Sequence, residues 1–238
     1  DRSEVERSLC HALAAVGRLD EADVILSNLA LSHDSDPRWF HTTVMLADVA
    51  YLRGDALLSL ELSQKALDGA RVANEGRFIV WASGQLSQAL LDLGRSSEAV
   101  QVLENALADK PSQDQPLTRI AAQIDLAKAL TAADRLDEAR AQFQVAEQAA
   151  LALGHRGMAT FCAGWIGGID LFSGNVSVAR PALAAADEGL RDAGREKPRA
   201  WIKLLHADAC LLEGDLEAAR VIAADGLAMS EEHHFGQS

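Results

Sequence analysis

The chain has 238 residues and a formal net charge of −13, and its apolar content of 49% includes only 5% aromatic residues. Acidic residues outnumber basic ones by 35 to 22, which argues against nucleic-acid binding because phosphate contacts need clustered Lys and Arg. No run approaches the roughly 18 to 20 apolar residues that cross a bilayer, and no signal-peptide core stands at the start, so neither a membrane contact nor a targeting segment is predicted.

The apolar content is mostly Ala and Leu, which favour helices over strands and predict an all-α protein. Three cysteines, Cys10, Cys162 and Cys210, are odd in number and widely separated. We interpret them as small buried apolar residues in a reducing compartment, which predicts a cytoplasmic location.

A short phrase returns along the chain, in which a turn residue is followed five positions later by a small residue. The copies run from Gly17 to Ala22, Gly54 to Ser59, Gly94 to Ala99, Asp134 to Ala139, Gly174 to Ala179 and Gly214 to Ala219. One step of 37 residues is followed by four steps of 40. A fixed period of this length indicates a stacked-repeat protein.

Each repeat is predicted to hold an A helix before the turn and a B helix after it. In chain order the expected helices cover 3–15 and 19–32, 37–52 and 55–73, 77–92 and 96–108, 116–132 and 136–152, 156–172 and 176–193, and 197–212 and 216–232. Asp36-Pro37 has the sequence of an N-cap followed by Pro in the first helical position. The polar stretch 109–116 is expected to be an ordinary turn between repeats, with a hinge or a partner contact as alternatives.

These helices predict six repeats within a single domain over 1–238. The approximate repeats are 1–35, 36–75, 76–115, 116–155, 156–195 and 196–235. Residue 1 already stands at the start of an A helix, and His233 to Gly236 have the phase of the next one. We therefore expect an excerpt of a longer array, and self-association through its uncapped ends stays open.

Small residues recur in phase on both helices of each repeat. Seven positions before the turns stand Cys10, Ala47, Ser87, Ala127, Gly167 and Ala207, and five positions after them stand Ala22, Ser59, Ala99, Ala139, Ala179 and Ala219. This phase predicts close approach of the two helices of each hairpin. A bulky residue at Ala99 or Ala139 is expected to overpack the contact and to cost roughly 1 to 3 kcal/mol.

This combination of small residues around a Gly-Arg/Asp turn resembles the tetratricopeptide repeat. The resemblance covers essentially the whole chain and implies an α-solenoid wound as a right-handed superhelix. The unit is longer than the tetratricopeptide unit of roughly 34 residues. Phrases such as Gly17-Arg-Leu-Asp-Glu-Ala22 look most like the helical-repeat sensor region of MalT-type transcriptional regulators, which are bacterial signalling ATPases of the LuxR family.

In tetratricopeptide proteins the concave face is formed chiefly by the A helices, so the resemblance implies ligand-binding positions there. Thirteen positions before the turns, the larger residues are His41, Trp81, Phe161 and Trp201. An aromatic ladder suits stacking against sugars or peptides. The alternative is that these rings only pack each A helix onto the preceding B helix.

A polar row six positions before the turns includes Asp48, Gln88, Lys128, Gly168 and Asp208. By helix geometry it shares a face with the ladder, and it suits hydrogen bonds to hydroxyl groups or to a peptide backbone. A solvated face without a ligand is the alternative. Tyr51, the only tyrosine, is expected near the same groove or in half-buried packing.

The A helix over 156–172 is unusually rich in glycine. Gly164 and Gly168 fall on the face that the resemblance makes concave, where missing side chains predict a pocket beneath Phe161 and Trp165. Close packing against a neighbouring helix is the alternative interpretation.

No catalytic constellation is present: the sequence has no phosphate-binding loop, no nucleophile elbow and no His-Glu-x-x-His motif. His233 and His234 are adjacent and point to different faces of a helix, so they form a poor metal pair. We expect neither a metal nor a cofactor nor enzymatic activity.

Two functions remain. In the first, the chain is the effector-sensing region of a MalT-like regulator and binds a small molecule such as a sugar. In the second, it is a tetratricopeptide scaffold that holds a peptide or helix of a protein partner.

Overall fold

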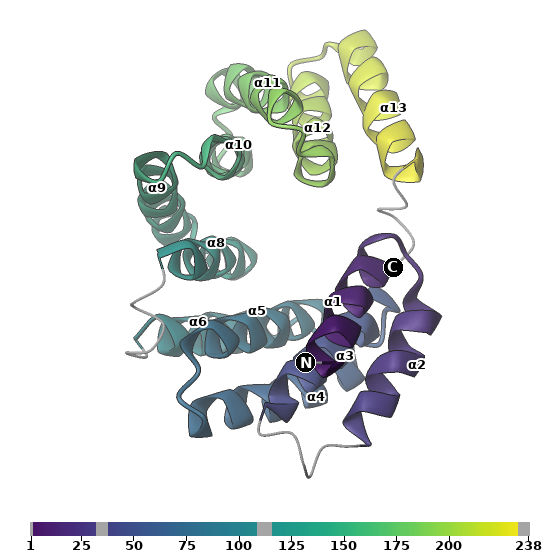
Figure 1. Cartoon of the computed structure of the whole chain (residues 1–238). Coiled ribbons are helices and arrows are strands. Elements are labelled where there is room, and N and C mark those ends of the chain that lie inside the picture. The colour runs from purple at the N-terminus through teal and green to yellow at the C-terminus, as the bar shows by residue number, and fades with distance from the viewer. Residues whose placement is uncertain (1, 32–37, 109–115, 233–238) are drawn as a thin grey trace. The chain divides into compact units, whose positions relative to one another are not determined.

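The structure, a computed structural model, describes residues 2–31, 38–108 and 116–232, and these residues form twelve α-helices and no strand (Figure 1). The helices are α1 (Arg2–Ala15), α2 (Leu19–Ala30), α3 (Trp39–Leu52), α4 (Ala56–Val72), α5 (Gly76–Asp92), α6 (Ser96–Ala108), α8 (Pro116–Ala132), α9 (Leu136–Ala152), α10 (Arg156–Phe172), α11 (Val176–Asp192), α12 (Glu196–Leu212) and α13 (Leu216–Glu232). The predicted all-α fold is confirmed.

The helices match the predicted ranges to within one residue at their ends, apart from α2, which ends at Ala30 instead of residue 32, and α3, which begins at Trp39 instead of residue 37. Asp36-Pro37, most of the 109–116 stretch and the segment His233 to Gly236 lie outside the described residues. Among the described helices, none is both long and apolar enough to span a membrane.

The repeated turn phrase marks the end of each A helix. Gly94, for example, has a φ of 72°, in the left-handed region where a Cβ is unfavourable, and Asp134 takes the same conformation with a φ of 59°. The Arg95 N–H donates to the Leu90 carbonyl at 2.8 Å and the Gly94 N–H to the Leu91 carbonyl at 2.9 Å. These bonds close a Schellman motif, which satisfies carbonyls that the helix end leaves without partners.

The small residues before and after the turns lie where the helices of a hairpin meet. All twelve are buried. Cys10 Sγ of α1 lies 3.7 Å from the Ala22 carbonyl of α2, and a Cβ added to Gly167 of α10 would lie 3.3 Å from Leu183 Cγ of α11. The predicted close approach is confirmed at these two hairpins.

The contacts divide the chain into two compact units, Asp1–Ala133 and Asp134–Gly236. The boundary falls at the turn between α8 and α9. A single domain over 1–238 therefore stays a prediction, and each unit is described by itself.

The first unit contains α1 to α8, and in it each helix packs against the next. The A helices α3, α5 and α8 also contact one another in sequence, as do α1 and α3.

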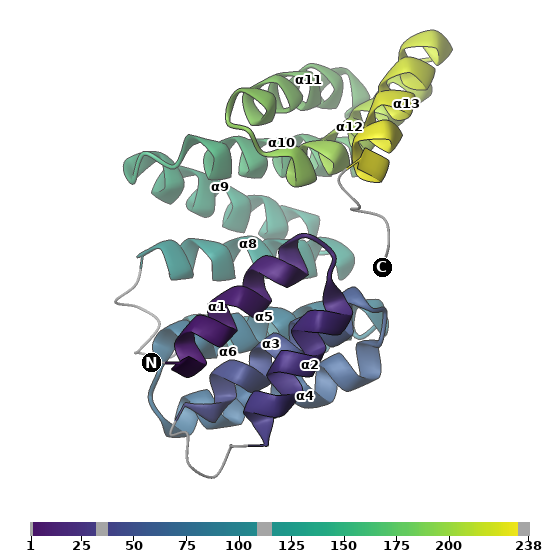
Figure 2. The ribbon, with the colours of Figure 1, turned by 45° about the vertical axis from the view of Figure 1, so that its right-hand side comes forward.

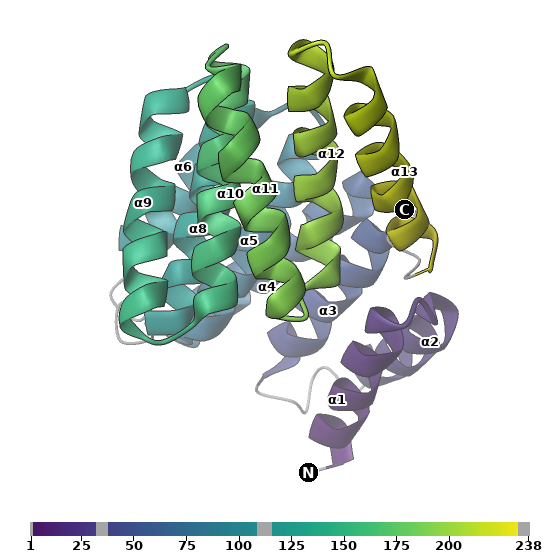
Figure 3. The same ribbon diagram turned by 90° about the horizontal axis from the view of Figure 1, so that it is seen from above.

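The second unit contains α9 to α13, which pack in sequence as antiparallel neighbours (Figures 2 and 3). The A helices α10 and α12 also contact each other directly. Its core includes Leu171, Leu183, Leu190, Ile202 and Leu205, which are all at least nine-tenths buried. Burial of this apolar face is what holds α10, α11 and α12 together.

Candidate functional site

Aromatic residues gather where α10 and α12 lie side by side. The Trp165 ring of α10 stacks on the Trp201 ring of α12 with centroids 5.8 Å apart and planes inclined by 30°. Phe161 meets Trp165 edge to face at 6.3 Å, and behind them the buried Phe143 of α9 stacks on Trp165 at 5.4 Å. We call Phe161, Trp165 and Phe172 of α10 together with Trp201 of α12 the aromatic stripe.

Each of the two helices carries its part of this surface on one face. Phe161, Trp165 and Phe172 stand at i, i+4 and i+11 of α10, so they share one face of the helix. On α12 the corresponding face carries Trp201, Asp208 and Leu212, all of them exposed. The surface is therefore apolar, with one carboxylate.

The prediction of a pocket at Gly164 and Gly168 is wrong. Both glycines are buried, and a Cβ added to Gly164 would lie only 2.6 Å from Ile202 Cδ1 of α12. A Cβ on Gly168 would lie 2.9 Å from Leu205 Cδ1. Side chains from α12 fill the space that the missing side chains leave, so the alternative of close packing holds.

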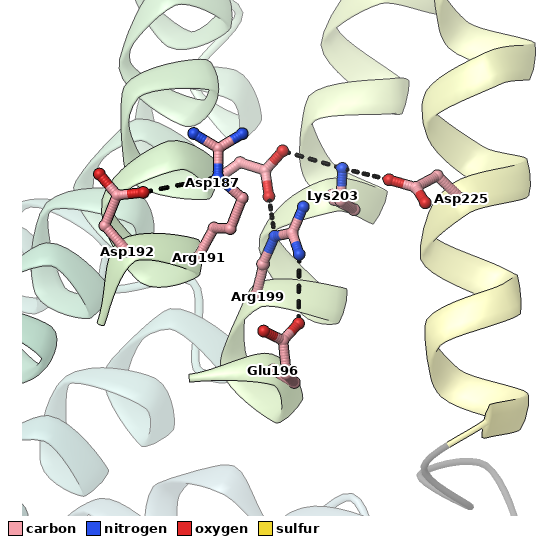
Figure 4. Close-up of polar contacts among 7 residues, drawn as sticks. All are labelled: Asp187, Arg191, Asp192, Glu196, Arg199, Lys203 and Asp225. Carbon is pink, nitrogen blue, oxygen red and sulfur yellow. Dashed lines mark hydrogen bonds and ion pairs between the residues drawn. The ribbon is translucent and has the colours of Figure 1, made fainter. Parts of the chain in front are cut away.

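A salt-bridge network fixes α12 between α11 and α13 (Figure 4). Lys203 Nζ lies 2.9 Å from Asp187 of α11 and 2.7 Å from Asp225 of α13. Arg199 Nε lies 2.7 Å from the other oxygen of Asp187, and Arg199 also pairs with Glu196 at 3.2 Å. Lys203 is only 5% exposed, so these carboxylates take the place of water around its ammonium group.

The network holds the side of α12 that lies opposite Trp201. Arg199 and Lys203 stand two residues before and after Trp201, which places them on roughly the opposite side of α12. Burial alone would raise the pKa of Asp187, but the hydrogen bonds from Lys203 and Arg199 outweigh it and the pKa lies below its ordinary value. Asp187 is therefore ionised at neutral pH and holds α12 by its cationic side.

The candidate residues of the first unit lie on α3, α5 and α8. His41 is buried and stacks on Phe78 with ring centroids 3.3 Å apart, and half-buried Trp81 lies 5.9 Å from the same ring. Asp48 accepts a hydrogen bond from Gln85 Nε2 at 2.9 Å. The contacts of His41 with Phe78 and of Asp48 with Gln85 join the neighbouring A helices α3 and α5. Neither sequence interpretation of these positions included a contact between A helices.

Three further candidates of this unit are half-buried: Tyr51, Gln88 and Lys128. Lys128 Nζ pairs with Asp125 at 2.6 Å. Burial raises the pKa of Tyr51, and the carboxylates of Asp92 and Asp48 raise it further, so the phenol is neutral at physiological pH. Within the first unit, Asp48 and Lys128 of the polar row thus have paired side chains, and the role of the row in ligand binding stays a prediction.

The structure therefore divides the candidate residues into two sets. The first unit brings together His41, Asp48, Tyr51, Trp81, Gln88 and Lys128, and the second holds Phe161, Gly164, Gly168, Trp201 and Asp208. Sequence reasoning missed Phe78, Phe143 and Gln85 as partners, because each stands outside the two rows chosen by phase. Only Trp165 had a signal, since it stands four residues after Phe161.

The three cysteines are free thiols and are buried, as predicted. Burial raises the pKa of all three, that of Cys162 to about 12, so none is a reactive thiolate at neutral pH. Among the described residues, no group of three or more His, Cys, Asp and Glu side chains is arranged to hold a metal ion.

Several solved structures have a similar arrangement of helices. NprR in complex with its cognate peptide NprX is 15% identical, with 99% of this chain and 69% of that chain covered at a TM-score of 0.76. A Rap protein complexed with Competence and Sporulation Factor is 12% identical, with 98% and 75% covered at 0.73. TPR-like repeats of a putative kinesin light chain from Podosopora anserina are 18% identical, with 83% and 97% covered at 0.60.

These likenesses show the fold, which is that of tetratricopeptide-like helical repeats. No protein-family model matches the sequence, and no curated protein matches it. The resemblance to MalT-type regulators stays a prediction.

Proposed function

We propose that this chain is a non-catalytic regulatory repeat domain that binds a peptide or a short protein segment on the aromatic stripe. The observation that carries the proposal is Trp201. Its side chain is 42% exposed, while stacking on Trp165 holds one face of the ring in place. A rigid, exposed aromatic ring gives up little conformational freedom on binding, and Trp is among the residues that dominate recognition energies.

The surface around Trp201 sets the chemistry of the ligand. Phe172 and Leu212 are half exposed or more and offer apolar contacts, and Asp208 adds a negative charge two turns along α12 from Trp201. The net charge of −13 has the same sign as Asp208. A peptide with apolar side chains and a basic group suits this surface.

The comparisons lend support by analogy. Two proteins with this fold, NprR and the Rap protein, were solved in complex with a peptide or with Competence and Sporulation Factor. At 12% and 15% identity, these two structures support the fold of this chain but do not identify its ligand.

A small-molecule effector is the second candidate, because the stacked rings of Trp165 and Trp201 also suit a sugar. In this case the chain would be the sensor region of a cytoplasmic, MalT-like bacterial regulator. The parent reading frame tests it: an upstream phosphate-loop ATPase and a downstream helix-turn-helix domain support the sensor.

Peptide binding is tested by selecting 12-residue peptides from a phage-displayed library on the purified chain and titrating the best one by fluorescence anisotropy. Trp201→Ala is expected to weaken binding at least tenfold, the usual effect of removing a central aromatic anchor. Leu227→Ala, which truncates a 58% exposed residue on α13, is the matched control and is expected to leave the affinity unchanged.

Equal binding by the wild type and Trp201→Ala would show that the stripe is not the site. A parallel titration with maltooligosaccharides separates the two candidates. Saturable quenching of tryptophan fluorescence by the sugars, lost in Trp201→Ala, would favour the small-molecule effector.

A further inference from the structure

A second exposed apolar surface lies on the first unit, where α3 begins beside the C-terminal half of α4. The Trp39 ring lies against Gly69: a Cβ added there would be 2.7 and 2.8 Å from Trp39 Cζ2 and Cη2. Lys65 Nζ lies 5.6 Å from the ring centroid, in cation–π contact. Gly69, which has no Cβ, is thus what lets the Trp39 ring come this close to α4.

The ring forms one side of a groove with a volume of about 820 Å³. We call it the α4 groove, and its lining residues are Trp39, Phe40, Leu60, Glu61, Gln64, Lys65, Asp68, Gly69, Val72 and Ala73. Val72, the last residue of α4, is 91% exposed. A volume of this size accommodates several side chains of a ligand.

Comparison with the other repeats shows that one exposed apolar residue beside the groove is particular to α4. Three residues past the turn, α4 carries Leu57, which is 68% exposed. The corresponding residues of the other B helices are all polar: Asp20, Ser97, Asp137, Ser177 and Glu217. Since Leu57 precedes Leu60 and Glu61 by one helical turn, it extends the apolar floor of the groove along α4.

The charges at the groove select the partner. Glu61 and Asp68 are exposed carboxylates seven residues apart, so they stand about 10 Å apart along the helix axis at 1.5 Å per residue. The lining cation, Lys65, lies over the Trp39 ring, and Gln64 Nε2 donates to Asp68 at 2.9 Å. The groove thus presents two acids, two turns apart, beside an apolar floor.

We infer that the α4 groove binds an amphipathic helix of a protein partner, with an apolar anchor between two basic residues spaced seven positions apart. A helix laid along α4 brings such residues opposite Glu61 and Asp68, with the anchor against Trp39 and Leu60. This surface uses other helices than the aromatic stripe and does not rest on the function proposed for it.

The test begins with an 18-residue helical peptide library displayed on phage and selected on the full chain. The expected sequences carry Leu, Phe or Met flanked by Lys or Arg at a spacing of seven. Raising NaCl from 50 to 500 mM is expected to weaken binding of the selected peptide, because its charge pairs with Glu61 and Asp68 lie at the solvent-exposed rim of the groove. Enrichment of acidic or uncharged peptides, or of none, would overturn the assignment.

Variants then locate the contact by anisotropy titration. Val72→Asn and Glu61→Lys change exposed residues, so folding is expected to be retained, and each is expected to weaken binding at least tenfold. Val178→Asn, at a 56% exposed residue of α11, serves as the control that leaves the affinity unchanged, and Trp201→Ala tests whether the peptide binds the aromatic stripe instead.

Unchanged binding in Val72→Asn, or loss only in Trp201→Ala, would place the peptide elsewhere. Two other occupants give different results. A concentration-dependent mass in sedimentation equilibrium that Val72→Asn abolishes would identify a second copy of the chain. Displaceable binding of the dye ANS without peptide binding would identify a small apolar ligand, and either result would overturn the inference.

Discussion

At the residue scale, the identity of a side chain is set by the distance between helices. Gly164 shows this most clearly, because Ile202 and the Ala186 Cβ occupy the space where its own side chain would be. Four glycines in α10 weaken the helix by about 1 kcal/mol each relative to alanine, and packing offsets this cost where α12 comes close. The missing side chain of Gly164 therefore allows α10 and α12 to pack closely.

Gly164→Ala is therefore expected to destabilise the protein. The new Cβ would lie 2.6 Å from Ile202 Cδ1 and 3.1 Å from the Ala186 Cβ. Overpacking costs about 1 to 3 kcal/mol, which outweighs the roughly 1 kcal/mol that alanine gains in helix propensity. Urea unfolding followed by circular dichroism measures the change in the free energy of unfolding.

Gly84→Ala is the control for this substitution. Its Cβ would meet only the end of the flexible Asp125 side chain, at 3.1 Å, so alanine is expected to stabilise there by up to about 1 kcal/mol. Adding Ile202→Val to Gly164→Ala removes the clashing methyl group and is expected to recover part of the loss. Equal effects at Gly164 and Gly84 would contradict the packing role.

At the scale of the element, α12 is held by charge on one side and by aromatic stacking on the other. Asp187 and Asp225 contact Lys203 from α11 and α13, while Trp201 stacks on α10. The salt bridges of Lys203 attach α12 to α11 and α13. The stacking on Trp165 sets the orientation of the Trp201 ring that α12 exposes to a ligand.

Asp187→Asn is expected to lower the free energy of unfolding at pH 7 by about 1.5 to 3 kcal/mol, because it removes charged hydrogen bonds to Arg199 and Lys203. The pKa of Asp187 in the folded protein is below its ordinary value of about 3.9. Its stabilisation is therefore complete above that value and is lost as the pH falls through the folded pKa. Denaturant unfolding at pH 7 and pH 3 is expected to show a smaller acid loss in the variant.

Asp192→Asn is the matched control on the same helix. Asp192 pairs with Arg191 at 3.5 Å, and its side chain is 75% exposed, so screening by water leaves this pair little energy. An effect of Asp192→Asn as large as that of Asp187→Asn would mean that the buried network is not what holds α12. Faster hydrogen exchange of α13 amides in Asp187→Asn would support the network's role.

At the scale of the whole molecule, the excess of 35 acids over 22 bases predicts the kind of ligand that this chain excludes. No measurable binding to a 20-base-pair DNA duplex is expected at 50 mM NaCl, since the phosphates and the protein repel each other. Fluorescence anisotropy with labelled duplex measures it. Binding that weakens steeply as salt rises would contradict this expectation.

The fold is shared with solved proteins at 12% to 18% identity. A repeat array requires few specific residues: a left-handed turn residue such as Gly94, a small residue such as Ala99 after it, and an apolar face on each helix. Each repeat contacts chiefly its neighbours, so other positions are free to change. This is why the helices were predictable to within one residue at most ends.

The candidate site was less predictable. The position of a residue within the repeat predicts the helix face on which it lies, but not the residues that it contacts. Trp201 was singled out from its position before the turn, and the structure adds its stacking on Trp165. The α4 groove was not predicted from the sequence. Leu57, at a position where the other B helices are polar, was the available signal.

The sequence by itself determined the twelve helices of the described residues to within two residues at their ends, the close approach at the α1–α2 and α10–α11 hairpins, and the net charge. These features depend on local propensity and on a period that the chain repeats six times. Only the tertiary structure decided that Ile202 and Leu205 fill the space at Gly164 and Gly168, and that Trp39 lies on Gly69 beside an open groove. The reason is physical. A missing side chain is the same in a pocket and in a close contact, and the neighbour that fills the space or leaves it open comes from another helix.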